Sequence, residues 1–530
     1  MAALALFAIV GLTSLFVARG HRLARLEADS NHRSFQQELK AAEFLLTTCT
    51  TEPDKLQQGL TLGESAAARY QILENPAWQE SKAIQLLSGE DQKQLRDSLG
   101  ELFFFLAQAR LSQARTSQDA NQKQSELATA LEWNKTAEKC YDADQASRAL
   151  AYQRAELEAL LNHPEEVKRI RERANTLPAW TCTDQYLLAA GYVSQGRYQE
   201  ALDLFEKVTR RSPANFWAWF MRGVCHDSLA QFEASASCYS TSIALRSEFP
   251  WGYYNRGLAE LRQRKYAEAR ADFDQALERR PDTPEALINR ALAKEGLELY
   301  AEAIHDLTHA LELQAPPTQV YYLRSRLLQK TGDRQGAQRD LAECVRLTPT
   351  TDVGWLARGY ARMTSDPKGA LADFNEGLKL NSRLLAGLQN KAHLLGRMGQ
   401  NEEALRVLDR AVEWYPDYVP ARAGRGVYHA RLAHRDLAHQ DAEESLRRDK
   451  SPLNIYQLAG IYALTSRSHP EDRKEALRLL VMALVKDVGL LKEVETDKDL
   501  DPIRQDKEFI QLVSKTRALR SGLDELGKRQ

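Results

Sequence analysis

Five arginines in this sequence are each followed, after fifteen or sixteen residues, by an aspartate. These pairs are Arg256 with Asp272, Arg290 with Asp306, Arg324 with Asp340, Arg358 with Asp373, and Arg425 with Asp441. A row of unpaired arginines would bind phosphate or carboxylate groups. Because aspartates accompany them, we predict structural ion pairs instead, each worth ~0.5–1 kcal/mol if partly exposed. Arg222 and Lys391 occupy equivalent positions, but they face Cys238 and Val407 and are predicted to lack an acidic partner.

Other residues capable of chemistry do not form a known catalytic pattern. His305 and His309 lie four residues apart, as in zinc-protease helices, but the glutamate base is absent and Asp306 is already assigned to Arg290. His429, His434 and His439 are spaced by five residues, which does not place them on one helical face. We therefore predict a protein without a metal, a cofactor or catalytic residues.

The elements that carry these residues follow from a regular repeat. A small residue recurs every 34 residues, with one step of 33: Ala155, Ala189, Gly223, Gly257, Ala291, Ser325, Gly359, Ala392, Gly426 and Gly460. This period is typical of a helix-turn-helix solenoid, in which small residues allow the paired helices to approach closely. The pattern resembles the tetratricopeptide repeat (TPR) and implies an all-α, right-handed superhelix of about ten units.

The resemblance to TPR proteins also indicates a binding surface. In that family the concave groove is lined mainly by positions 2, 5, 9 and 12 of each first helix. Here these positions include aromatic side chains that could anchor a peptide: Trp217, Phe220, Trp251, Tyr254, Tyr322 and Tyr360. Packing between neighbouring hairpins is the alternative role for these rings. Position 5 offers no lysines, which argues against a ligand held by a lysine clamp on its carboxylate.

Outside the repeats, the sequence changes character at both ends. Residues 1–19 contain an uncharged run from 2 to 18, predicted to be a single-pass membrane anchor; a signal peptide and a chance apolar start are the alternatives. We expect a helical spacer over 20–100, a divergent hairpin over 101–147, the TPR array over 148–488, and capping helices over 489–530. In the cap, we expect Phe509, Ile510, Leu512 and Val513 to face inward.

Composition narrows the possible partners. The 530 residues include 72 basic and 73 acidic side chains, so the formal net charge is -1 and general binding to nucleic acid is not expected. The six cysteines form no C-x-x-C pair, which argues against a zinc knuckle or a dense disulfide framework. A protein or peptide ligand is therefore the predicted partner.

Several segments, among them EFPWGYYNRGLAELRQRKYAEA and YPDYVPARAGRGVYHARL, are similar to the C-terminal half of bacterial membrane-bound Ser/Thr protein kinases with TPR arrays. The kinase motifs themselves are absent from this sequence. The resemblance implies a membrane-anchored, non-catalytic scaffold. One alternative is the sensor half of a receptor-like kinase whose kinase is separately encoded; another is a soluble exported binding protein. The family arrangement favours an array outside the cytoplasm, whereas Arg19, Arg22 and Arg25 favour the inside.

Overall fold

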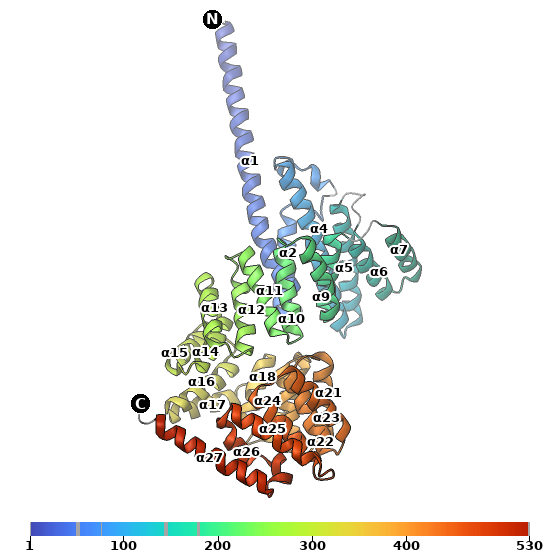
Figure 1. The fold of residues 1–530 in the computed structure, drawn as a ribbon. Helices are drawn as coiled ribbons and strands as arrows, with labels where there is room; N and C mark the ends of the chain where they lie inside the picture. Colours follow the sequence, from blue (N-terminus) through green and yellow to red (C-terminus); the bar gives the residue numbers. More distant parts are fainter. Residues whose placement is uncertain (1, 49–52, 76, 142–146, 178–180, 528–530) are drawn as a thin grey trace. The chain divides into compact units, whose positions relative to one another are not determined.

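The computed structural model describes residues 2–48, 53–75, 77–141, 147–177 and 181–527, with side-chain surroundings given from residue 19 to residue 521 within these ranges, Pro53 excepted. Every regular element in these ranges is helical, and most of the helices form successive hairpins along the chain (Figure 1). The chain divides into two compact units, Met1–His226 and Asp227–Gln530. We describe each unit by itself.

The first unit begins with long helices and continues with three pairs or part-pairs of shorter ones. Its elements are α1 (Ala2–Thr48), α2 (Pro53–Ala68), the 3-10 helix η1 (Trp78–Glu80), α3 (Lys82–Gln85), α4 (Gly89–Thr116), α5 (Ala120–Cys140), α6 (Arg148–Leu160), α7 (Pro164–Thr176), α8 (Cys182–Ser194), α9 (Tyr198–Arg211) and most of α10 (Phe216–Ser228).

The second unit consists of successive hairpins and a C-terminal segment. The helices are α11 (Phe232–Leu245), α12 (Pro250–Arg262), α13 (Tyr266–Arg279), α14 (Pro284–Gly296), α15 (Tyr300–Glu312), α16 (Pro317–Thr331), α17 (Arg334–Arg346), α18 (Asp352–Arg362), α19 (Pro367–Leu380), α20 (Leu385–Arg397), α21 (Asn401–Trp414), α22 (Val419–Arg431), α23 (Arg435–Arg448), α24 (Pro452–Thr465), α25 (Asp472–Lys486), η3 (Val488–Leu490), α26 (Leu491–Thr496), η4 (Lys498–Ile503) and α27 (Lys507–Gly527).

Local sequence signals explain where these helices begin and end. Several first helices start with proline at an N-terminal position, where the missing N–H costs no helical hydrogen bond. The tight turn inside many hairpins contains one residue with positive φ, such as Arg264 at 61° or Gly399 at 78°. A left-handed residue at this position ends the first helix and lets the chain reverse direction.

The core of the first unit is built around α4. Phe103, Phe104 and Phe105 are all buried on this helix, together with its leucines. Gln153 of α6 is also buried, and it donates hydrogen bonds to the Phe104 carbonyl at 3.1 Å and to Gln108 at 3.0 Å. The buried polar group is thereby satisfied, as buried amides require.

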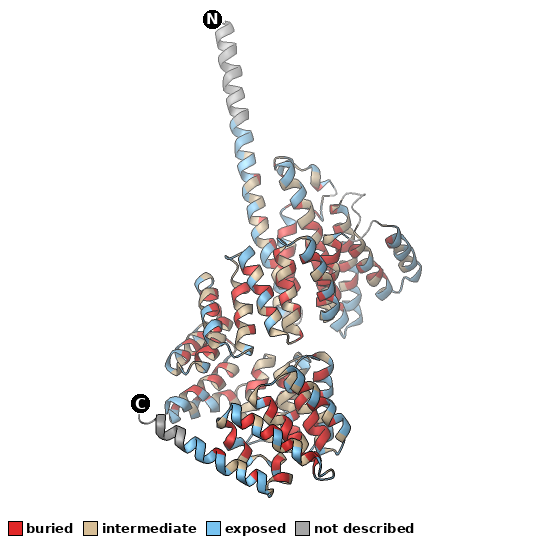
Figure 2. Cartoon of the chain, in the orientation of Figure 1, coloured by how far each residue is buried: buried red, intermediate tan, exposed pale blue. Residues whose placement is uncertain are grey.

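In the second unit, buried side chains lie along the facing sides of the paired helices (Figure 2). In two hairpins the small residue of the first helix lies against a phenylalanine of the partner helix: Gly257 against Phe273, and Gly359 against Phe374. At Gly359 of α18, an added Cβ would stand 2.4 Å from the buried ring of Phe374 in α19. Only glycine therefore fits at this helix contact without displacing the ring.

The C-terminal segment covers the last hairpin with apolar side chains. Leu500, Ile503 and Phe509 are buried in one cluster with residues of α24 and α25, and Leu512 and Val513 are partly buried against it. Ile510 is 52% exposed, so the expectation that it faces inward is wrong. It follows Phe509 directly, and neighbouring residues of a helix point about 100° apart.

Among the residues whose side chains are described, none of the helices combines the length and the hydrophobicity that a transmembrane span requires. The predicted anchor at residues 2–18 belongs to α1, but its side chains lie outside the described residues. The structure thus gives no support to the predicted single-pass membrane topology, or to either side for the array.

Candidate functional site

The five arginines and aspartates singled out by their spacing lie opposite each other within hairpins. The shortest nitrogen–oxygen distance is 2.7 or 2.8 Å in every pair: Arg256–Asp272, Arg290–Asp306, Arg324–Asp340, Arg358–Asp373 and Arg425–Asp441. In each pair, Nε and Nη2 of the guanidinium donate to the two oxygens of one carboxylate. This bidentate geometry fixes the rotation of both side chains.

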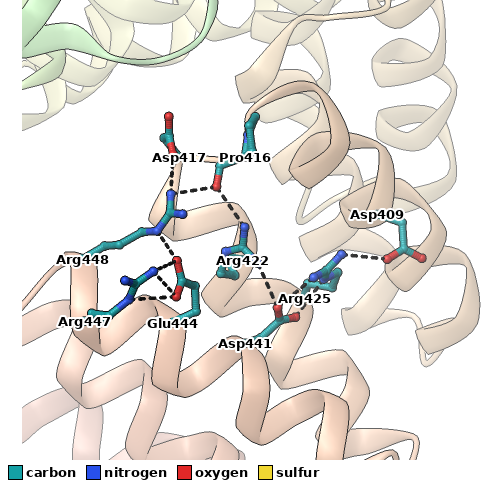
Figure 3. A network of polar contacts seen from close by, with 9 residues as sticks. All are labelled: Asp409, Pro416, Asp417, Arg422, Arg425, Asp441, Glu444, Arg447 and Arg448. Atoms are coloured by element: carbon teal, nitrogen blue, oxygen red, sulfur yellow. Dashed lines mark hydrogen bonds and ion pairs between the residues drawn. The ribbon is translucent and has the colours of Figure 1, made fainter.

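Four of these arginines also contact the second helix of the preceding hairpin. Arg290 Nη1 donates to Asp274 at 2.8 Å. Arg425 Nη1 donates to Asp409 at 3.4 Å, and Figure 3 shows these two side chains directed toward each other. In two other hairpins a hydroxyl accepts this hydrogen bond instead of a carboxylate. Arg256 donates to Ser240, and Arg324 donates to Thr308. These arginines therefore join second helices of successive hairpins as well as the two helices of one hairpin.

The aspartates of these pairs are more buried than the sequence-based energy assumed. Their side chains are 1–9% exposed, and the arginine side chains are 12–25% exposed. Removing one partner of such a pair leaves a charge without compensation in a dry position. Replacing one of these aspartates by a neutral residue should therefore cost more than the ~0.5–1 kcal/mol of a surface pair.

Arg222 and Lys391, the two residues predicted to lack an acidic partner, make no such contact with a carboxylate among the described side chains. Arg222 contacts the Thr209 hydroxyl at 3.4 Å, and its guanidinium lies 5.3 Å from the centre of the Trp219 ring. Lys391 makes no hydrogen bond or ion pair with any residue whose side chain is described. It lines a pocket of about 760 Å³ between α19, α20 and α21.

Four of the six aromatic residues predicted for the groove lie in the second unit, where they form two clusters. In the first cluster, Trp251 and Tyr254 of α12 meet edge to face, with ring centres 5.4 Å apart. Tyr254 also packs against Phe273 at 5.9 Å, and its hydroxyl accepts a hydrogen bond from Asn289 of α14 at 3.1 Å. Both rings are half-buried. They contribute to packing and keep part of their surface accessible.

The second cluster joins three successive first helices. The rings of Tyr322 in α16 and Tyr360 in α18 stack in parallel, with centres 5.6 Å apart and an angle of 8° between their planes. Asn390 of α20 donates a hydrogen bond to the Tyr360 hydroxyl. Burial raises the pKa of Tyr360 to about 12, so this hydroxyl remains protonated and neutral. We call Tyr322, Tyr360 and Asn390 the tyrosine platform.

The site predicted from the sequence does not include Asn289 and Asn390. Both occupy position 6 of a first helix, one repeat beyond the tyrosine that they contact. The sequence pattern that identifies both residues is an asparagine at position 6 of a first helix, with a tyrosine in the first helix of the preceding unit.

Trp217 and Phe220 belong to the first unit and differ from each other in exposure. Trp217 is half-buried and meets Phe220 edge to face at 5.8 Å. Phe220 is fully buried and packs against Phe216 at 6.0 Å and Phe44 at 6.2 Å. Its assignment to an accessible groove is wrong, because the ring is buried; Phe44 of α1, an element outside the repeat, is one of the rings packed against it.

Comparison with protein families agrees with this architecture. Two family models, both described as tetratricopeptide repeat, match residues 186–246 and 254–317 in one case, and 318–351 and 386–418 in the other. The matched ranges between residues 186 and 418 therefore carry tetratricopeptide repeats. No match was found among curated proteins.

Solved structures with partial similarity include other repeat proteins. A tetratricopeptide repeat protein from Parabacteroides merdae is 17% identical, with coverage of 53% of this chain and 98% of that one and a TM-score of 0.33. A "MamA RS-1 ArsTM double mutant" is 15% identical, covering 31% and 92% with a TM-score of 0.30. The APC/C hetero-tetramer Cut9-Hcn1 is 15% identical, covering 77% and 93% with a TM-score of 0.34. These matches do not support the resemblance to membrane-bound kinases.

Proposed function

We propose that this chain is a non-catalytic scaffold that binds a segment of a protein partner at the tyrosine platform. Scaffolding through protein–protein contacts is the function that its TPR architecture supports. The stack of Tyr322 on Tyr360 is the observation that carries the more specific proposal. It presents aromatic surface from two successive first helices, where a concave wall is expected.

The chemistry of this surface favours an apolar or aromatic anchor on the partner. Half-buried tyrosines offer large contact area at low entropic cost, which makes them frequent hot spots in interfaces. Arg326 lies over the Tyr322 ring, 5.8 Å from its centre, and its charge is balanced by Glu295 at 2.8 Å. A partner segment with an exposed apolar or aromatic side chain would fit this surface.

Affinity capture from the native cell extract tests the proposal with a matched pair of variants. Tyr322→Ala removes half of the stack, whereas Tyr321→Ala removes its neighbour, a similarly half-buried ring at position 4 of the same helix. We expect capture of the partner to be lost with Tyr322→Ala and retained with Tyr321→Ala. Equal capture by both variants, with circular dichroism and melting unchanged, would show that the platform serves packing alone.

A further inference from the structure

The row of Arg–Asp contacts is interrupted at one hairpin of the second unit. At the position of the arginines, α20 carries Lys391. The residues sixteen positions after and before it are Val407 and Asn375, where Arg290 has the carboxylates of Asp306 and Asp274. Lys391 is thus the only residue of this series in the second unit that has no carboxylate opposite it among the described residues.

The interruption leaves a pocket between the helices. Lys391, Val407 and Asn375 all line the space of about 760 Å³ between α19, α20 and α21. This volume lies within the range of pockets that hold small ligands. Apolar side chains also line it, among them Leu371, Leu388 and Trp414.

The charges of the pocket are unbalanced. Lys379 pairs with Glu376 at 2.6 Å, and Arg406 pairs with Glu403 at 3.0 Å, each within one helix. Lys391 and Arg410 remain as two further cations, and neither has an ion-pair partner among the described side chains. Burial lowers the pKa of Lys391, and the positive charge of Arg410 lowers it further. An anion bound between Lys391 and Arg410 would reduce their mutual repulsion and would compensate the charge of the half-buried Lys391.

We propose that this pocket binds a carboxylate carried on an apolar group, with Lys391 and Arg410 contacting the carboxylate. The bound group takes the role that aspartate has in the other hairpins, and the leucines and Trp414 cover its apolar part. This site is separate from the tyrosine platform and does not depend on the function proposed there. The carboxylate can belong to a free amphiphilic acid or to an acidic residue with apolar neighbours in a peptide.

Isothermal titration of the full chain distinguishes these sources. The free acid is represented by octanoate below its micelle concentration, with octanol as its neutral control. The peptide is represented by acetyl-Leu-Leu-Asp-Leu-Leu-amide, with the Asn analogue as its control. We expect at least one acidic probe to bind ten times more tightly than its neutral control. The tighter of the two acidic probes identifies the source.

Three variants test the assignment of residues. Lys391→Met should weaken binding of the acidic probe at least tenfold, whereas Lys379→Met, at the same pocket but paired with Glu376, should change it less than twofold. Val407→Asp supplies the missing carboxylate and should weaken binding as strongly as Lys391→Met while preserving the melting temperature. The proposal is overturned if neither acidic probe binds better than its neutral control, or if Lys391→Met binds as the unmodified chain does.

Discussion

Arg290 and Asp306 face each other across the α14–α15 hairpin through two hydrogen bonds of 2.9 and 2.7 Å. Asp306 is only 1% exposed and also lies 2.9 Å from Lys294, while Arg290 reaches Asp274 at 2.8 Å on the preceding hairpin. One buried carboxylate thus balances two cations and holds two helices in register. Because the guanidinium extends to a second hairpin, the contact also couples neighbouring repeats.

Asp306→Ala should destabilise the protein by about 2–3 kcal/mol, because it leaves two partly buried cations without their shared anion. Chemical denaturation followed by circular dichroism measures the loss. Glu343→Ala is the control, since it removes an exposed pair with Arg346 within one helix. Its effect should stay below about 0.5 kcal/mol. Similar losses for the two variants would argue against a structural role of burial in these pairs.

Two glycines at equivalent repeat positions should respond in opposite directions to alanine. Gly359→Ala places a methyl group 2.4 Å from the buried Phe374 ring and should cost about 1–3 kcal/mol. At Gly460, the nearest atom to the added Cβ is Asp499 Cβ at 3.6 Å, an ordinary contact. Gly460→Ala should therefore be neutral or stabilise by up to ~1 kcal/mol through helix propensity. The melting temperatures of the two variants, compared with that of the unmodified protein, test this prediction. A stabilised Gly359→Ala protein would contradict the close packing described for α18 and α19.

Periodicity predicts the parts of this fold whose determinants lie within one repeat. The helix pairs follow from the 34-residue period, and both members of contacts such as Arg290–Asp306 can be named from their spacing. The failures occur where another element intervenes. Phe220 occupies a groove position of the repeat but is buried and packs against Phe44 of α1, which no repeat pattern describes. Likewise, spacing identifies Lys391 as lacking a partner, but the pocket beside it depends on how three helices pack.

Lowering the pH from 7.5 to 5.5 should reduce the contribution of His429 to stability. This side chain is 8% exposed, and burial lowers its pKa below the ordinary value of 6.5. A histidine with a lowered pKa binds protons more readily in the unfolded chain, so its contribution is lost as pH falls through 6.5 towards the folded pKa. The melting temperature of His429→Gln should therefore fall less over this interval than that of the unmodified protein. Other groups titrate in the same interval, so the difference between the two proteins is the relevant quantity. An identical decrease in both would show that His429 does not contribute.

The C-terminal segment offers a comparison of two adjacent residues. Phe509 is 4% exposed and belongs to the cluster that covers α24 and α25, whereas Ile510 is 52% exposed. Phe509→Ala should cost about 3–5 kcal/mol if the whole array unfolds together. If the end of the array opens separately, the loss should appear as faster hydrogen exchange in α26 and α27. Ile510→Ala should leave both the melting temperature and the exchange rates nearly unchanged.

The end of a solenoid needs such a cover, because the last hairpin otherwise exposes the apolar face that an additional repeat would bury. Equal effects of the two substitutions would mean that α27 does not pack on the array through Phe509.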